Sequence, residues 1–208
     1  MRGVYNEKVN ARIDTRQRIL ESARDLIYAR SYADVGVASI CERAGVRKGS
    51  FYHFFPSKRD LTLAVLEDYF LGFKEALLDR AFAPDIPPLE RLQRLARMVY
   101  EHQRALSEAS GHLLGCPFGN LAAELSTQDE PIRKKVASIF RQVQVYLRQT
   151  LEEAQAQGQL EGIDTQATAQ AMFAYMEGVL LMAKTRNDPE VLRRLLPAIS
   201  RIRVEATG

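Results

Sequence analysis

The chain has 208 residues, of which 46% are hydrophobic and 26% charged, so it can bury a core and is not a disordered protein. No apolar run approaches the roughly 20 residues that cross a bilayer, and the start has no signal-peptide pattern. We therefore expect a cytoplasmic protein with no membrane partner. Its net charge is +3, but residues 1–60 hold 12 Lys and Arg against 7 Asp and Glu. A basic excess confined to one end is typical of a nucleic-acid partner, although it also occurs on solvated helices.

The N-terminal part is predicted to hold four helices. Asp14 and Gln17 resemble a capping box before a helix over about 15–30. A short helix with one apolar face then ends at Gly45, which suits a left-handed turn. Another short helix over 48–55 must stop before Pro56, and Ser57 caps a fourth helix that reaches about residue 80.

The rest of the chain also has helical periodicity, and no window has the alternation of a strand. Helices are expected over 89–108, 118–126, 131–157, 165–185 and 189–204. We predict an all-α protein of about nine helices with two domains. Residues 1–60 form a three-helix DNA-binding bundle, and residues 61–208 form a helical core for ligand binding and dimerisation.

Two short helices joined by a glycine turn make a helix-turn-helix, whose second helix enters the major groove of DNA. That second helix carries many hydrogen-bond donors. Phe51, Phe54 and Phe55 form an apolar side that can fix it to the core, and Gly49 permits close approach of the groove wall. The alternative is that the aromatic residues are only core and the cations only a solvated face. The residues predicted to contact DNA are Arg47, Lys48, Gly49, Ser50, Tyr52, His53 and Lys58, the last holding a phosphate at the next helix start.

Segment 44–55, AGVRKGSFYHFF, followed by Ser57 and Lys58, resembles the recognition region of the TetR family of transcriptional repressors. The resemblance covers about residues 13–65, including ILESA at 19–23. It implies a dimeric repressor that binds a palindromic operator and a small-molecule effector. One departure is Gly36 before the second helix, where many members have a capping Thr or Ser. Segment 115–126, GCPFGNLAAELS, resembles a branch that responds to electrophiles or small unsaturated acids.

The resemblance also implies an apolar effector pocket in the core and a dimer interface on the last two helices. For each pocket residue, ordinary core packing is the alternative. Pocket and sensor candidates are Cys116, Phe118, Phe73, Val99, Phe140, Val143 and Tyr175, with His102 and Tyr146 as polar anchors. Candidates for the dimer interface are Met172, Met176, Val179, Leu195 and Ile199, which could instead face the core. No cofactor is expected, and His102 and His112 lack metal-ligand spacing.

Cys116 stands between Gly115 and Pro117, which suits the start of a helix. There the helix dipole is expected to lower the thiol pKa and make Cys116 a sensor of oxidants or electrophiles. The alternative is a small buried residue, as we expect for Cys41. Two other functions stay open at this point. One is a small helical enzyme with Cys116 as nucleophile, and the other is a constitutive DNA binder without an effector.

Overall fold

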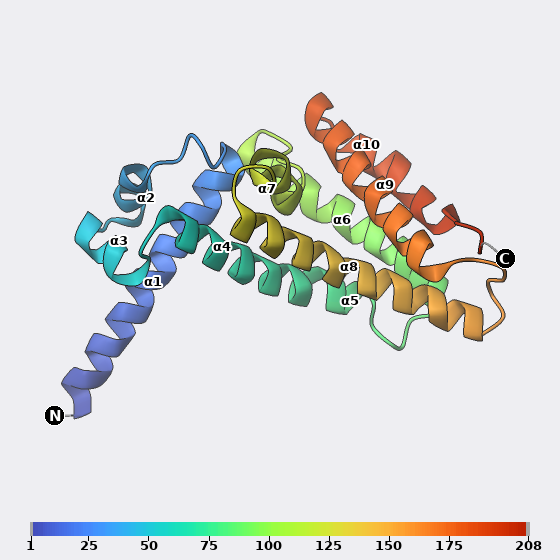
Figure 1. Cartoon of the computed structure of the whole chain (residues 1–208), viewed down its shortest axis with the longest axis horizontal. Coiled ribbons are helices and arrows are strands. Elements are labelled where there is room, and N and C mark those ends of the chain that lie inside the picture. Colours follow the sequence, from blue (N-terminus) through green and yellow to red (C-terminus); the bar gives the residue numbers. More distant parts are fainter. Residues whose placement is uncertain (1, 207–208) are drawn as a thin grey trace. The chain divides into compact units, whose positions relative to one another are not determined.

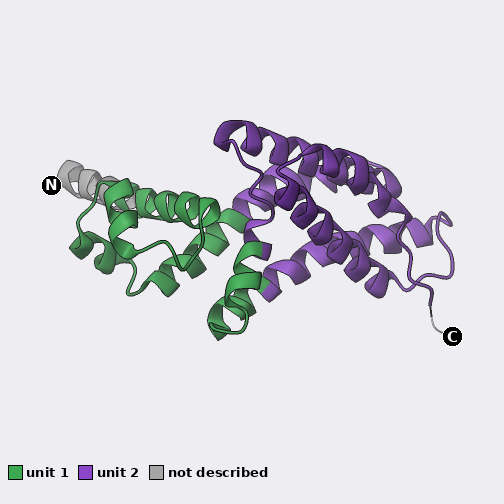
Figure 2. Cartoon of the chain, turned by 90° about the horizontal axis from the view of Figure 1, so that it is seen from above, with its two compact units in different colours: residues 1–70, 120–136 green, residues 71–119, 137–208 purple. Residues whose placement is uncertain are grey.

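A computed structural model describes the backbone of residues 2–206 and the side chains of residues 14–206. Every regular element in that part of the chain is helical, apart from one isolated bridge between Ile163 and Glu205. Within the described residues the helices form nine continuous stretches, which confirms the all-α prediction. Figure 1 shows their order along the chain. Contacts divide the chain into two compact units, residues 1–70 with 120–136 and residues 71–119 with 137–208 (Figure 2). The predicted domain boundary at residue 60 stays a prediction.

The first unit contains α1 (Arg2–Ala29), α2 (Val37–Ala44), α3 (Lys48–Phe54) and most of α4 (Lys58–Phe73). The Ser57 hydroxyl accepts the Asp60 N–H at 3.1 Å, which confirms the predicted cap of α4. The predicted cap at Asp14 is wrong. Residue 14 lies inside α1, which begins at Arg2, and its carboxylate instead pairs with Arg18 one turn later, at 3.6 Å.

The second unit contains the remainder of α4, then a π-helical segment (Lys74–Leu78) that continues into α5 (Asp79–Ala81). These segments carry the fourth helical stretch to residue 81, close to the predicted end. The unit also contains α6 (Pro88–Ser110), most of α8 (Glu130–Ala156), α9 (Thr165–Arg186), α10 (Glu190–Leu195) and a 3-10 segment (Leu196–Arg201). Helix α7 (Pro117–Leu125) begins at Pro117, as the sequence predicts.

A buried arginine anchors the turn that precedes α6. Arg91 is only 6% exposed, and its guanidinium donates to the carbonyls of Pro84 and Ile86 and to the Glu153 carboxylate. The distances are 3.3, 2.8 and 2.7 Å. A planar group with five donors can satisfy all three acceptors at once, which a lysine cannot do in the same geometry. Arg91 therefore fixes the proline-containing turn onto the helices of the second unit.

Candidate functional site

The helix-turn-helix of the first unit is built around a glycine turn. Gly45 has φ 64° and ψ 40°, the left-handed conformation that the sequence predicted there. Its N–H donates to the Glu42 carbonyl at 3.1 Å, and the Val46 N–H donates to the Cys41 carbonyl at 2.9 Å. These bonds end α2 and turn the chain into α3. Gly36 caps α2 with no side-chain hydrogen bond, as its lack of a hydroxyl requires.

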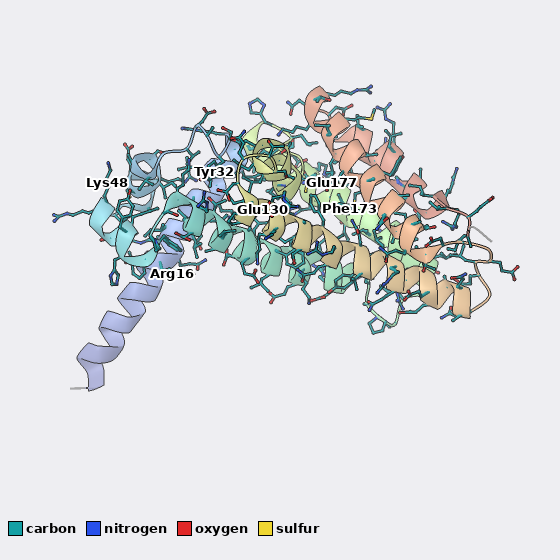
Figure 3. All side chains as sticks on the ribbon, viewed as in Figure 1. Arg16, Tyr32, Lys48, Glu130, Phe173 and Glu177 are labelled. Carbon is teal, nitrogen blue, oxygen red and sulfur yellow. The ribbon has the colours of Figure 1, made fainter. Side chains whose placement is uncertain are left out.

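Helix α3 has one buried side and one exposed side. Phe51 is fully buried and Phe55 is 3% exposed, so both belong to the core of the unit. Tyr52 is 53% exposed, and the centre of its ring lies 5.1 Å from that of Phe51. The residues Arg47, Lys48, Gly49 and His53 are exposed, while Ser50 and Phe54 are half-buried. Figure 3 labels Lys48 on this helix. The predicted DNA-contacting residues from Lys48 to His53 thus share a helix whose opposite side is buried, whereas Arg47 immediately precedes this helix and Lys58 begins α4.

Lys58 differs in its surroundings from the other predicted DNA-contacting residues. Its ammonium donates to the carbonyls of Tyr32 and Val35 at 2.8 and 3.0 Å and lies 3.8 Å from the centre of the Tyr32 ring. Burial lowers the pKa of this ammonium. Two of its three donors are therefore engaged within the protein, leaving one for a phosphate. The main contact of Lys58 is with the connector between α1 and α2.

Glu124, on the part of α7 that belongs to the first unit, holds the same connector. Its carboxylate accepts the backbone N–H groups of Tyr32 and Ala33 at 2.9 and 2.7 Å. Lys58 and Glu124 thus bind the carbonyls and the N–H groups of one short segment. Nearby, Arg59 pairs with Asp129 at 2.5 Å. The sequence analysis missed Glu124, because a contact across about 90 residues leaves no local pattern.

Replacing Glu124 by alanine is expected to lower the free energy of unfolding by roughly 1–3 kcal/mol, since two hydrogen bonds to a charged acceptor are lost. Amide hydrogen exchange should accelerate most at Tyr32 and Ala33, whose N–H groups lose their acceptor. Urea unfolding measures the free energy, and mass spectrometry of the exchanged peptides measures the exchange. Glu42→Ala, which removes an exposed carboxylate on α2, serves as the control. Equal acceleration in the two variants would contradict the role given to Glu124.

The effector candidates lie in the second unit, where two aromatic pairs bring some of them together. The rings of Phe73 and Phe118 are 6.1 Å apart, and those of Phe140 and Phe173 are 4.8 Å apart. Val99 and Val143 are 6% and 3% exposed. All of these contacts also occur in an ordinary core, so the pocket assignment stays a prediction.

The pocket candidate Tyr175 and the two predicted polar anchors, His102 and Tyr146, keep these roles as predictions, and their surroundings are as follows. The Tyr175 hydroxyl donates to the Leu195 carbonyl at 2.8 Å, and the Tyr146 hydroxyl donates to Asp79 at 2.7 Å. His102 is exposed, whereas the neighbouring Gln103 is only 5% exposed. The buried polar residue on this part of α6 is therefore Gln103, which the sequence analysis did not single out.

The thiol of Cys116 does not have the low pKa expected from its place at the start of α7. Burial of the thiol and the neighbouring Glu177 carboxylate raise its pKa well above the ordinary value, although the residue as a whole is only half-buried. Hydrogen bonds from the N–H groups of Gly119, at 3.3 Å, and Phe118 act in the expected direction but are outweighed. Burial also raises the pKa of Glu177. The expected lowering of the Cys116 pKa is thus corrected to a raised pKa, in a thiol that lies beside the Glu177 carboxyl group.

The predicted dimer face on the last helices also needs correction. Met172, Met176, Val179 and Ile199 are at most 5% exposed, because they pack into the core of their own unit. Leu195 is half-buried. The large apolar side chains that α9 exposes are the adjacent Leu181 and Met182, at 61% and 41%. An apolar stripe on a helix predicts that this face is buried, but it does not indicate whether the same chain or a partner covers the face.

The described residues contain neither a metal-binding cluster nor a membrane-spanning helix. Nowhere among them do three His, Cys, Asp or Glu side chains gather in a way that could hold a metal ion. None of the described helices has the length and apolar composition to cross a membrane.

Two family models match the chain. Residues 19–65 match that of bacterial regulatory proteins of the tetR family, and residues 88–199 match the tetracyclin repressor-like C-terminal domain. The first match contains the whole helix-turn-helix. The second extends from the start of α6 into the 3-10 segment that follows α10 and covers more than half of the chain.

Similar proteins agree with these matches. The transcriptional regulator AcuR of Cereibacter sphaeroides is 34% identical over 178 residues, which cover 85% of this chain and 79% of that protein. The transcriptional repressor NemR of Escherichia coli is 27% identical over 192 residues, 91% of this chain and 94% of that one. A crystal structure of regulatory protein TetR from Rhodobacter sphaeroides has a TM-score of 0.80 at 33% identity, covering 90% of this chain and 98% of that one. The chain therefore belongs to the TetR family of DNA-binding transcriptional regulators.

Proposed function

We propose that this regulator represses transcription by binding a palindromic operator as a homodimer, and that a small-molecule effector or modification of Cys116 releases it. The observation that carries the DNA-binding part is the two-sided α3. Phe51 and Phe55 bury one side, while Lys48 and Tyr52 on the other are exposed. A helix held this way can present donors to base edges and phosphates in the major groove. Its site of action in this proposal is the cytoplasm, where the DNA of a bacterium lies.

The proposed contacts divide by residue type. Arg47, Lys48 and His53 supply cationic or neutral N–H donors, and Ser50 and Tyr52 supply hydroxyls. At Gly49 a Cβ would meet nothing within 4 Å in the free protein, so packing in the fold does not require the glycine. In this proposal its missing side chain lets the groove wall approach the helix. Lys58 contributes its remaining donor to a phosphate. Cationic side chains raise the affinity for DNA of any sequence, because their contacts with phosphates release counterions. Contacts with base edges give the sequence preference.

Dimerisation in this proposal uses the exposed part of α9, where Leu181 and Met182 stand next to each other. Large exposed apolar side chains are candidates for burial against a partner. Two copies would place their α3 helices about one turn of DNA apart, roughly 34–36 Å. An effector releases the operator only if it binds more tightly to a state in which that spacing is lost.

Two other functions can be distinguished from the proposed one. Since the family consists of transcriptional regulators, the chain is not an enzyme with a Cys116 nucleophile. A constitutive DNA binder would share the α3 contacts but would show no change in operator affinity with any effector.

The test is a fluorescence-anisotropy titration with duplex DNA from the promoter next to the gene, at physiological salt. We expect binding at least about 1,000-fold tighter than to a shuffled duplex of the same composition, with two chains per site. A panel of small acids and electrophiles should include a compound that weakens this binding. Equal affinity for the promoter and the shuffled duplex would contradict the proposed function, and insensitivity to the whole panel would leave a constitutive binder.

A further inference from the structure

The side chains of the helix-turn-helix restrict which base it can recognise by two hydrogen bonds at once. Segment 36–58, which spans the helix-turn-helix and the first residue of α4, contains no Asn or Gln, the amides that fit adenine in this way. Its one acidic residue is Glu42, and a carboxylate is what accepts from cytosine. Glu42 lies on α2, so α3 has no carboxylate of its own. The base left for a bidentate contact with α3 is guanine, whose O6 and N7 both accept hydrogen bonds.

Two cationic side chains stand at the start of α3, and they differ in shape. Arg47 immediately precedes the helix and Lys48 is its first residue, which Figure 3 labels. A guanidinium is a planar fork of N–H groups that fits two acceptors side by side, whereas an ammonium is a compact charge that also suits a phosphate. Arg47 is therefore the better match for the two acceptors of guanine.

The guanidinium of Arg47 is available for such a contact. Arg47 is exposed, and its side chain forms no ion pair or hydrogen bond with any described residue. Among the other arginines described in the first unit, only Arg30, which follows α1, is exposed in the same unpaired way. The rest have partners: Arg16 lies over the Phe55 ring, Arg18 pairs with Asp14, Arg24 and Arg43 pair with Asp25, Arg59 pairs with Asp129, and Arg133 pairs with Glu130. Arg47 can contact a base without first losing an ion pair.

The backbone of Arg47 is fixed, although its side chain has no polar partner. Its carbonyl accepts the N–H groups of Ser50 and Phe51 at 2.9 and 3.2 Å. Phe51 is fully buried, so these bonds tie Arg47 to the core of the unit. On the other side, the Val46 N–H donates to the Cys41 carbonyl at 2.9 Å and closes the turn. Arg47 thus has a defined place at the end of α3 from which a recognition helix contacts base edges.

We propose that Arg47 determines the sequence specificity of the operator and reads one guanine in each half of it, with two N–H groups donating to O6 and N7. This inference rests on the proposed function, because it names the base that the DNA-contacting helix recognises. Lys48, Tyr52 and Lys58 then contribute affinity through contacts that do not select this guanine.

The first experiment selects bound sequences from a pool of random duplexes at physiological salt, with the full-length chain and three alanine variants. The unchanged chain should select an inverted repeat with a guanine at the same place in each half. Arg47→Ala should select the same repeat without a preference at that place. Lys48→Ala should keep the guanine, and so should Arg30→Ala, which removes the other unpaired arginine of the first unit and is the matched control.

The second experiment changes the guanine itself. In 7-deazaguanine a C–H group replaces N7, while O6 and the base-pairing edge are kept. Anisotropy titrations with the selected duplex should show that this replacement weakens binding of the unchanged chain at least about fivefold, as loss of a base contact does. The same replacement should leave the affinity of Arg47→Ala unchanged, because the two changes remove one interaction. Thermal unfolding of Arg47→Ala should match that of the unchanged chain.

The outcomes separate this inference from the proposed function. If Arg47→Ala still selected the guanine, or if 7-deazaguanine weakened binding of both chains equally, Arg47 would not be the residue that reads it. Loss of the guanine from the Lys48→Ala motif alone would assign that contact to Lys48 and overturn the inference. An inverted repeat without a required guanine would also overturn it, yet would still support a dimer on a palindrome. Binding with no enriched motif would contradict both.

Discussion

Alanine at both Lys48 and Tyr52 is expected to weaken operator binding roughly 100-fold while lowering thermal stability only slightly, through loss of the ring contact between Tyr52 and Phe51. Each side chain offers donors on the exposed side of α3, and a good contact with a base contributes about 1–3 kcal/mol. Neither makes up the core, which Phe51 and Phe55 form behind them. Anisotropy titrations with promoter DNA, repeated over a series of salt concentrations, measure the loss.

The two single variants separate the contribution of Lys48 to operator affinity from that of Tyr52. Lys48→Ala should reduce the slope of log affinity against log salt by about one if it contacts a phosphate. Tyr52→Ala should leave that slope unchanged. Arg97→Ala removes an exposed cation from α6 and serves as the control for net charge. If Arg97→Ala weakened binding as much as Lys48→Ala, the loss would reflect overall charge and α3 would not be the DNA-contacting element.

Replacing Phe51 by alanine is expected to lower the free energy of unfolding by about 3–5 kcal/mol, the cost of removing a buried phenyl ring from a core. Phe51 is fully buried, and its ring contacts those of Tyr52 and Phe55, with centres 5.1 and 6.2 Å apart. A loss of this size is a large part of the stability of a small unit. Urea unfolding followed by circular dichroism measures it, and operator binding should be lost with the fold of α3.

Phe54→Ala provides the comparison, since Phe54 lies on the same helix but is only half-buried. Phe54→Ala should lower the free energy of unfolding by only a fraction of the loss expected for Phe51→Ala. Phe51→Leu should recover most of the stability and most of the DNA binding, because it refills the core without restoring the aromatic contacts. A Phe51→Ala protein as stable as the parent would show that α3 is held by something other than its aromatic side.

The features that could be predicted from the sequence are those encoded locally. Gly45 indicated a left-handed turn, Pro56 the end of α3, and Ser57 the cap of α4, and each takes that place. In each case the residue type itself restricts the backbone or supplies a capping oxygen. A local pattern gave a wrong prediction at Asp14, because the capping pattern there occurs inside a longer helix.

The features that could not be predicted depend on contacts between distant segments. Glu124 meets the connector after α1 about 90 residues away in the chain, and Glu177 meets Cys116 across about 60. The helix dipole at Cys116 is a sound local argument for a lowered pKa, but burial of the thiol and a carboxyl group from another helix raise that pKa instead. The apolar stripe of α9 was found, yet its coverage by the same chain depends on packing that periodicity does not encode.

The most direct test of the central claim is methylation protection of the promoter by dimethyl sulfate, which modifies guanine N7 in the major groove and adenine N3 in the minor groove. Two α3 helices in successive major grooves predict protected guanines in two groups about 10 base pairs apart, both lost with Lys48→Ala and Tyr52→Ala together. Protection confined to adenine N3, or a pattern unchanged in that double variant, would contradict the placement of α3 in the major groove.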